Sequence, residues 1–192
     1  MKIGIFGGTF NPIHIGHAII ANYVIQHCNL DQLWLMVSPL NPFKVAQGEV
    51  NDEHRLRMAE MVSRRIDHVE TSGFEFTLPR PSYTVDTLNA LQQKFPDDEF
   101  IILIGADNWA AFDRWLKHEE LIEKYHVMVY PRQGYPIEVP GQWASHVEII
   151  QAPIIEISSI TIRHELKNGL DMSFYMPDDV YNYVKHHKLY QE

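Results

Sequence analysis

Short apolar runs alternate with stretches of helical periodicity along most of the chain. The apolar runs predict strands at residues 2–6, 32–37, 68–71, 99–104, 126–130 and 147–150. The amphipathic stretches predict helices at residues 15–26, 52–65, 82–95, 159–168 and 177–187, with a further helix beginning at Ala106. Strands that alternate with helices normally pair in parallel through right-handed crossovers. The pattern therefore predicts an α/β fold, a doubly wound, mostly parallel sheet with helices on both faces.

The loops that follow strands are the expected place for function, because ligands of doubly wound sheets bind beyond the carboxyl ends of the strands. The connections at residues 38–50 and 131–146 are long for such a fold. Near the end of the sequence, Ser158 or Ser159 is expected to cap a helix and Pro177 to take a first helical position. No repeat or linker divides the sequence, so residues 1–192 are expected to form a single domain.

Charge and cysteine content narrow the class of protein. The formal net charge of −9 disfavours DNA or RNA binding through a broad basic face, although a local cluster could hold a small anion. The lone Cys28 cannot form an internal disulfide, which favours a reducing, cytoplasmic setting. Nothing resembles a secretion signal, and no stretch approaches the ~20 apolar residues of a membrane span. We expect a soluble protein with no membrane contact, either a monomer or a homo-oligomer.

The junction between the first strand and the first helix carries the most informative segment, which reads Gly-Gly-Thr-Phe-Asn-Pro-Ile-His-Ile-Gly-His from Gly7 to His17. Glycines there let backbone amides approach an anion, and the helix dipole favours phosphate. His14 and His17 are expected on one helical face, where bound phosphates would favour their charged forms. The alternatives are a tight turn with two surface histidines, or a zinc site. Zinc is the weaker of these because no third ligand is evident nearby.

This segment resembles the His-x-Gly-His signature of a nucleotidyltransferase superfamily. A second segment, Ile-Ser-Ser-Ile-Thr-Ile-Arg from Ile157 to Arg163, resembles that superfamily's Ile-Ser-Ser-Thr-x-Ile-Arg sequence. The resemblance implies a Rossmann-like domain in which the second segment opens a helix that holds the β and γ phosphates of ATP. Ser158 and Ser159 offer caps and hydroxyl donors, and the planar guanidinium of Arg163 suits phosphate oxygens.

Within the superfamily, the sequence is similar to the bacterial nicotinate mononucleotide adenylyltransferases over about residues 3–184. Pro-Ser-Tyr-Thr-Val-Asp-Thr-Leu at residues 81–88 and Ile-Gly-Ala-Asp at 104–107, followed by Trp115, carry this similarity. It implies that Thr84 and nearby amides receive the nicotinate carboxylate, that Trp115 stacks on the pyridine ring, and that Gly105 and Asp107 contact ATP. The alternatives are a core or interface role for Trp115 and a helix cap at Asp107.

The activity that the resemblance implies is adenylyl transfer from ATP to nicotinate mononucleotide. His17 would stabilise the α-phosphate, assisted by His14, with Mg²⁺ carried mainly by the ATP phosphates and no metal ligand from the protein. The residues implied in ATP binding are Gly8, Thr9, Phe10, His14, His17, Lys44, Gly105, Asp107, Ser158, Ser159 and Arg163. Those implied for the acceptor are Thr84 and Trp115.

The sequence departs from the family pattern at a few positions. Phe43 stands where a histidine is common, Ile160 replaces a threonine, and Gln133 replaces a proline in the turn that follows Arg132. Whether Arg132 faces phosphates or solvent stays open. Two rival functions also remain: pantetheine phosphate adenylyltransferase, and a nucleotide-sensing module without catalysis on the same fold.

Overall fold

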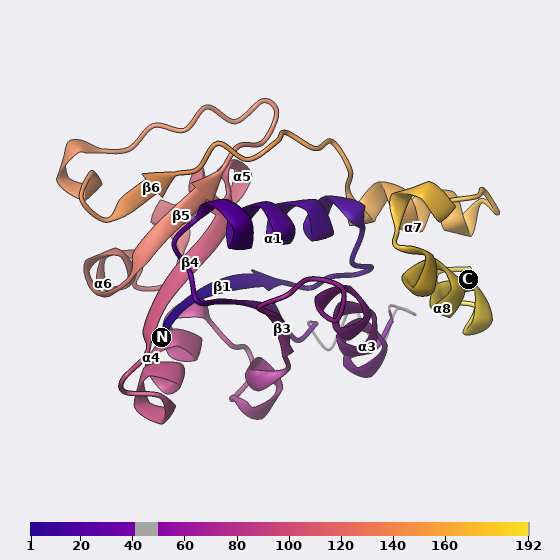
Figure 1. Cartoon of the computed structure of the whole chain (residues 1–192), viewed down its shortest axis with the longest axis horizontal. Helices are drawn as coiled ribbons and strands as arrows, with labels where there is room; N and C mark the ends of the chain where they lie inside the picture. The colour runs from indigo at the N-terminus through magenta and orange to yellow at the C-terminus, as the bar shows by residue number, and fades with distance from the viewer. Residues whose placement is uncertain (41–49, 192) are drawn as a thin grey trace.

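The computed structural model describes residues 1–40 and 50–191, and its centre is a parallel sheet (Figure 1). The described strands are β1 (Lys2–Gly8), β2 (Gln32–Val37), β3 (Val69–Ser72), β4 (Glu99–Gly105), β5 (His126–Tyr130) and β6 (Val147–Ile149). They pair in the order β3-β2-β1-β4-β5-β6, and every pairing is parallel. The strand order reverses between β1 and β4, which is the switch point where doubly wound folds bind their ligands.

Helices cover both faces of the sheet, which confirms the predicted fold class. The described α-helices are α1 (Ile15–His27), α3 (Asp52–Ser63), α4 (Thr84–Lys94), α5 (Ala106–Trp109), α6 (His118–Lys124), α7 (Ser159–Lys167) and α8 (Asp178–His186). Short 3-10 helices lie at η1 (Phe74–Thr77), η2 (Phe112–Arg114), η3 (Gly141–Trp143) and η4 (Ser173–Tyr175).

The alternation of side chains along the strands builds two hydrophobic cores, one on each face. On β1, Phe6 belongs to the core that packs under α1, α3, α7 and α8. Ile3 and Ile5 point to the other face and join the core under α4, α5 and α6. In Figure 1, α7 and α8 lie at the end of the sheet toward which β1 runs, so they reach the carboxyl ends of the central strands.

Several predicted helices differ from the observed ones at their ends. The helix predicted at 82–95 begins at Thr84, because Tyr83 is extended and lies just beyond Pro81. The helix predicted from Ala106 ends after one turn at Trp109, and α6 was not predicted. Lys117, in the left-handed region at φ 54°, separates the η2 region from α6. At the last helix Pro177 is the N-cap residue instead of the first helical residue.

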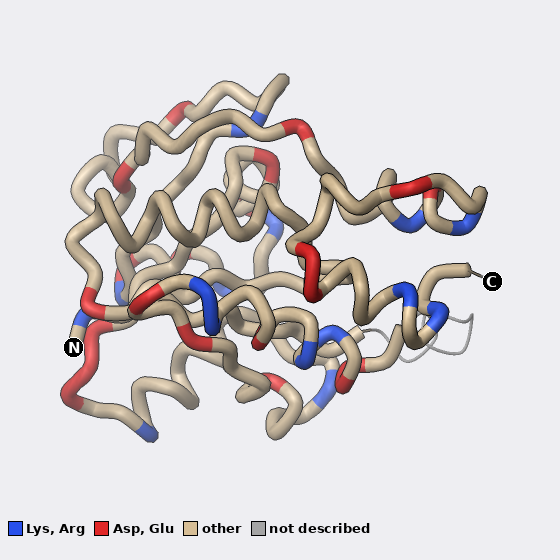
Figure 2. The backbone as a smooth tube through the Cα atoms, turned by 45° about the vertical axis from the view of Figure 1, so that its right-hand side comes forward, with Lys and Arg blue, Asp and Glu red and all other residues tan. Residues whose placement is uncertain are grey.

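Charged residues are dispersed over the described chain. In Figure 2 acidic and basic positions are interspersed along the tube in this view. No helix of residues 1–40 and 50–191 has both the length and the apolar character required to cross a membrane.

Candidate active site

A cavity of about 250 Å³ opens at the switch point of the sheet. The carboxyl ends of β1 and β4 form its floor, and the first turn of α4 forms one wall. Its lining residues are Ile5, Phe6, Gly7, Gly8, Thr9, Ser38, Glu75, Thr84, Thr87, Leu88, Ile102, Leu103, Ile104, Gly105, Asn108, Trp115 and Tyr130. Gly8, Thr9, Thr84, Gly105 and Trp115 were named from the sequence, and the fold brings them together around one space.

Thr84 and Trp115 reach this cavity from different elements. Thr84 is the first residue of α4, at the positive end of the helix dipole. Trp115 follows η2, and its ring centroid lies 5.4 Å from that of Phe112. Trp115 is thus partly a packing residue of the second core and partly a wall of the cavity.

His14 and His17 lie on the opposite face of the sheet, at the start of α1. Their rings stack with centroids 3.7 Å apart, and His14 is the N-cap residue of the helix. His14 is only 4% exposed and His17 is half-buried, so the interpretation as two surface histidines is wrong for His14. The backbone N–H of His14 donates to Nδ1 of His17 at 3.2 Å. Neutral His17 therefore carries its proton on Nε2, which leaves that atom as the donor.

Burial governs the protonation of this pair in the nucleotide-free protein. Desolvation, with a smaller contribution from Arg132, lowers the pKa of His14 to about 3. Desolvation also lowers the pKa of His17 well below its usual value, assisted by the charges of His14 and Arg132. Burial thus favours the neutral forms of both imidazoles over the expected charged forms. Nδ1 of His14 is buried against the first turn of α1, beside Gly16.

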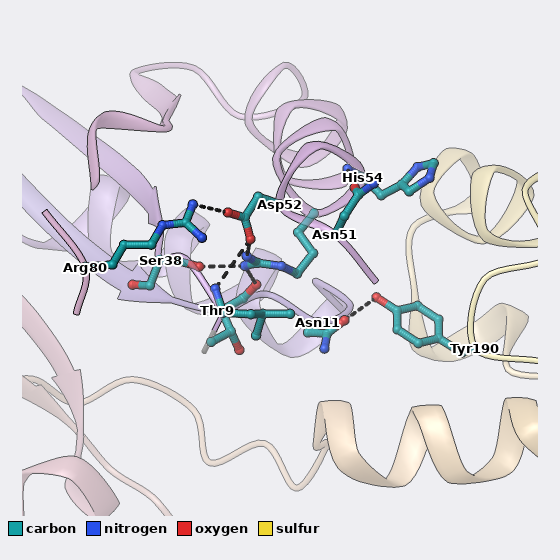
Figure 3. A network of polar contacts seen from close by, with 10 residues as sticks. Thr9, Asn11, Ser38, Asn51, Asp52, His54, Arg80 and Tyr190 are labelled. Carbon is teal, nitrogen blue, oxygen red and sulfur yellow. Dashed lines mark hydrogen bonds and ion pairs between the residues drawn. The ribbon is translucent and has the colours of Figure 1, made fainter. Parts of the chain in front are cut away.

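The loop from Gly8 to Pro12 is held from outside by hydrogen bonds to its carbonyl oxygens. On α7, Ser159 Oγ donates to the carbonyl of Pro12 at 2.9 Å, and Arg163 donates to that of Asn11 at 2.7 Å. The Tyr190 hydroxyl donates to Oδ1 of Asn11 at 2.6 Å. Figure 3 shows Asn11 and Tyr190 facing each other across this contact. The two signature segments are therefore in direct contact.

Arg55 holds the same loop from the other side. Its side chain is fully buried and donates to the carbonyls of Thr9 and Ser38, and it pairs with Asp52. Asp52 in turn accepts from Arg80 at 2.7 Å (Figure 3), and Arg80 lies just before the segment at residues 81–88. Sequence reasoning missed Arg55. The available signal was its place on the apolar face of α3 with Met58, Ala59 and Val62, where a charged residue needs buried partners.

The structure describes the positions of some of the remaining residues named in the sequence analysis and leaves others undescribed. Ser158 is the N-cap of α7, and its Oγ accepts from the Thr161 N–H at 3.1 Å. Phe10 is 2% exposed and packs on Phe6 and His17, so it is a core residue at the start of the loop. Ile160, which replaces a threonine, is 71% exposed. Lys44 and Phe43 lie outside the described residues.

Asp107 and Arg132 face each other at the edge of the site. Arg132 Nε lies 3.6 Å from Asp107 Oδ1, and the guanidinium also approaches the carbonyl of Ile155 at 3.5 Å. Gly105, the residue before α5, is its N-cap, so Asp107 is not the cap. A Cβ on Gly105 would lie 2.4 Å from Asp107 Oδ1, so a larger residue there would displace the Asp107 carboxylate. Arg132 thus turns toward the site instead of solvent.

Comparison with known proteins agrees with this geometry. Residues 5–165 match the family described as Cytidylyltransferase-like. The chain is 41% identical to a probable nicotinate-nucleotide adenylyltransferase of Bacteroides thetaiotaomicron, over 96% of this chain and 91% of that protein. It is 39% identical to one of Flavobacterium johnsoniae over the full length of both. The chain belongs to the nicotinate-nucleotide adenylyltransferase family. It is therefore an enzyme, a nucleotidyltransferase.

Solved structures of adenylyltransferases share the fold. The nicotinic acid mononucleotide adenylyltransferase of Plasmodium falciparum, complexed with NaAD, superposes with a TM-score of 0.82 at 18% identity, covering 98% of this chain and 97% of that one. A putative nicotinate-nucleotide adenylyltransferase of Vibrio parahaemolyticus gives 0.69 at 25% identity, covering 100% and 96%. The resemblance stated from the two signature segments is confirmed.

Replacing Arg55 with Met should destabilise this adenylyltransferase by about 2 to 4 kcal/mol, because it leaves the carbonyls of Thr9 and Ser38 without their donor and removes one of the two cations that pair with Asp52. The matched control is Arg57→Met on the same helix, whose side chain is 51% exposed and should cost less than ~0.5 kcal/mol. Urea denaturation of both variants measures the difference. Equal stability of the two variants would contradict the structural role of Arg55.

Acid should destabilise the nucleotide-free enzyme through His14. Its folded pKa of about 3 lies below the usual 6.5, so between these values the unfolded state binds more protons. The free energy of unfolding should fall by about 1 kcal/mol for this group between pH 7 and pH 5.5. His14→Gln should remove that part of the decrease, whereas His27→Gln, at the far end of α1, should keep the wild-type slope. An unchanged slope in His14→Gln would show that the imidazole titrates normally.

Proposed function

We propose that this enzyme transfers the adenylyl group of ATP to the 5′-phosphate of nicotinate mononucleotide, giving nicotinate adenine dinucleotide and pyrophosphate. The observation that carries the proposal is the contact between the two signature segments beside a cavity at the switch point. Ser159 Oγ and the carbonyl of Pro12, 2.9 Å apart, join the start of α7 to the loop before α1.

The acceptor ring is assigned to the cavity on the α4 side of the sheet. Trp115 offers an indole face for stacking on the pyridine ring, and Thr84 offers its hydroxyl at the start of α4. An unpaired helix N-terminus supplies amide donors of the kind that bind carboxylates. These features support recognition of the nicotinate carboxylate by Thr84 and its neighbouring amides.

The triphosphate is assigned to the space between the starts of α1 and α7. Ser158, Ser159 and Arg163 lie in the first turns of α7, where the helix dipole favours anions. Arg163 carries five N–H donors, so the bond that it makes to Asn11 does not exhaust the guanidinium. Thr9 and Gly105, which also line the acceptor cavity, and Asp107 are assigned to ATP as well, as is Lys44, which lies outside the described residues.

Catalysis is assigned to alignment and charge stabilisation. The attacking phosphate monoester has a second pKa of about 6, so it is largely a dianion at neutral pH and requires no general base. The Nε2 proton of His17 would be directed at the α-phosphate, where negative charge develops as pyrophosphate leaves. His14 would supply a second imidazole from its stacked position.

Mg²⁺ fits this site as a metal ion that the phosphates of ATP coordinate. No group of three His, Cys, Asp or Glu side chains within residues 1–40 and 50–191 is arranged to hold a metal ion. Mg²⁺ retains several waters and commonly binds through substrate phosphates, where it would neutralise their charge. The reducing setting favoured by the lone Cys28 fits a cytoplasmic enzyme.

His17→Ala should lower kcat by at least ~100-fold, the scale observed when one preorganised donor to developing charge is removed. His27→Ala, an exposed histidine at the other end of α1, is the matched control and should retain wild-type turnover. Pyrophosphate release from MgATP and nicotinate mononucleotide measures both. Near-full turnover of His17→Ala would remove this residue from the mechanism.

The enzyme should prefer the acid over the amide mononucleotide by at least ~10-fold in kcat/KM. A carboxylate accepts hydrogen bonds at both oxygens, whereas an amide turns its NH₂ toward one donor and leaves it unpaired, at a cost of about 1 to 3 kcal/mol. The assay compares the two acceptors, and phosphopantetheine as a third, at saturating MgATP. Equal efficiencies for acid and amide would overturn acid specificity, and turnover with phosphopantetheine alone would indicate the rival adenylyltransferase.

A further inference from the structure

The cavity assigned to the acceptor contains one charged side chain among its described lining residues. This is Glu75, in the η1 turn, which is 8% exposed. The other lining residues are apolar, aromatic, hydroxyl-bearing, amide-bearing or glycine. Glu75 is therefore the one side chain of the described lining that can give this cavity a negative charge, although an acidic substrate is assigned to it.

Within the described residues, the partners of the Glu75 carboxyl group are hydroxyl groups, which form hydrogen bonds with it, and none is a cation. Thr87 Oγ1, on the buried face of α4, donates to Glu75 Oε1 at 3.1 Å. Burial raises the pKa of Glu75, and hydrogen bonds with Ser38, Thr87 and Ser82 oppose that shift. No ion pair involving Glu75 occurs within the described part of the chain.

A buried carboxylate that is solvated only by hydroxyls is stabilised when a positive charge enters its surroundings. The pyridine nitrogen of the acceptor is bonded to ribose, so the ring is a cationic pyridinium. The indole of Trp115, which also lines the cavity, attracts cations through the face of its π-system. Two features of the cavity, Glu75 and Trp115, thus complement the positive charge of the ring.

We propose that Glu75 is a specificity-determining residue that recognises the positive charge of the pyridinium ring. The proposal rests on the assignment of the acceptor to this cavity. It separates two tasks. Thr84 and nearby amides distinguish acid from amide, whereas Glu75 distinguishes the cationic aromatic ring from a neutral ring of similar size.

The probe is nicotinate mononucleotide in comparison with its 1,4-dihydro form. Reduction makes the ring neutral but leaves the carboxylate, the ribose and the reacting 5′-phosphate in place. The wild-type enzyme should favour the cationic form by at least ~10-fold in kcat/KM, on the scale of one partly buried charge interaction. Glu75→Gln, which is nearly isosteric, should reduce that preference to less than about 3-fold. The loss should appear mainly as a raised KM for the cationic acceptor, with the KM for MgATP unchanged.

Glu75→Asp keeps the charge and should retain a preference for the cationic form. Glu99→Gln, at the exposed start of β4, is the matched control and should behave as wild type. A preference in Glu75→Gln equal to that of wild type would overturn the proposal, even if both acceptors were used more slowly. That result would give Glu75 only the role of holding α4.

A separate variant tests the assignment on which the proposal rests. Trp115→Ala should raise the KM of both ring forms, because it removes a wall of the cavity. If neither KM changes, the acceptor does not bind in this cavity and the site assignment fails. If both rise while Glu75→Gln keeps the wild-type preference, the site assignment stands and the role of Glu75 is wrong.

Discussion

The orientation of the loop between β1 and α1 is the constraint on which the proposed chemistry depends. Carbonyl oxygens of this loop accept hydrogen bonds from four separate groups: the Ser38 N–H, Arg55, Arg163 and Ser159. Each of these bonds offsets the partial negative charge of a carbonyl oxygen near the position proposed for the phosphates. A loop of free carbonyls would repel a polyanion, so the distant helices α3 and α7 are as necessary to the site as the signature residues themselves.

The proposed site has two halves, one on each face of the sheet, and they meet at the carboxyl ends of the strands. The acceptor cavity lies on the α4 side, and the stacked histidines lie on the α1 side with Arg132 and Ile155. Phe6 and Tyr130 line the hollows on both sides and so separate them. Two nucleotides approaching from opposite faces would bring their phosphates together only beyond the carboxyl ends of β1 and β4, which is where adenylyl transfer requires them.

Local sequence patterns were sufficient to predict the strands of the sheet and to locate the two signature segments. Apolar runs such as residues 99–104 indicate buried parallel strands, and the segment from Gly7 to His17 marks the junction of the first strand and the first helix, although the glycine pair itself belongs to β1. The features that the sequence patterns did not predict have a common physical origin. The end of α5, the start of α6 and the burial of Arg55 and Glu75 all depend on tertiary contacts with residues distant in sequence, which no window of neighbouring residues contains.

The contact between Tyr190 and Asn11 spans 179 positions of the sequence. Asn11 lies in the turn after β1, and Tyr190 follows α8. During synthesis Asn11 is therefore translated before the other strands and helices, so the nascent chain can build much of its core before Tyr190 restrains this turn. The contacts that α7 and Tyr190 make with the turn form only after those elements have been synthesised.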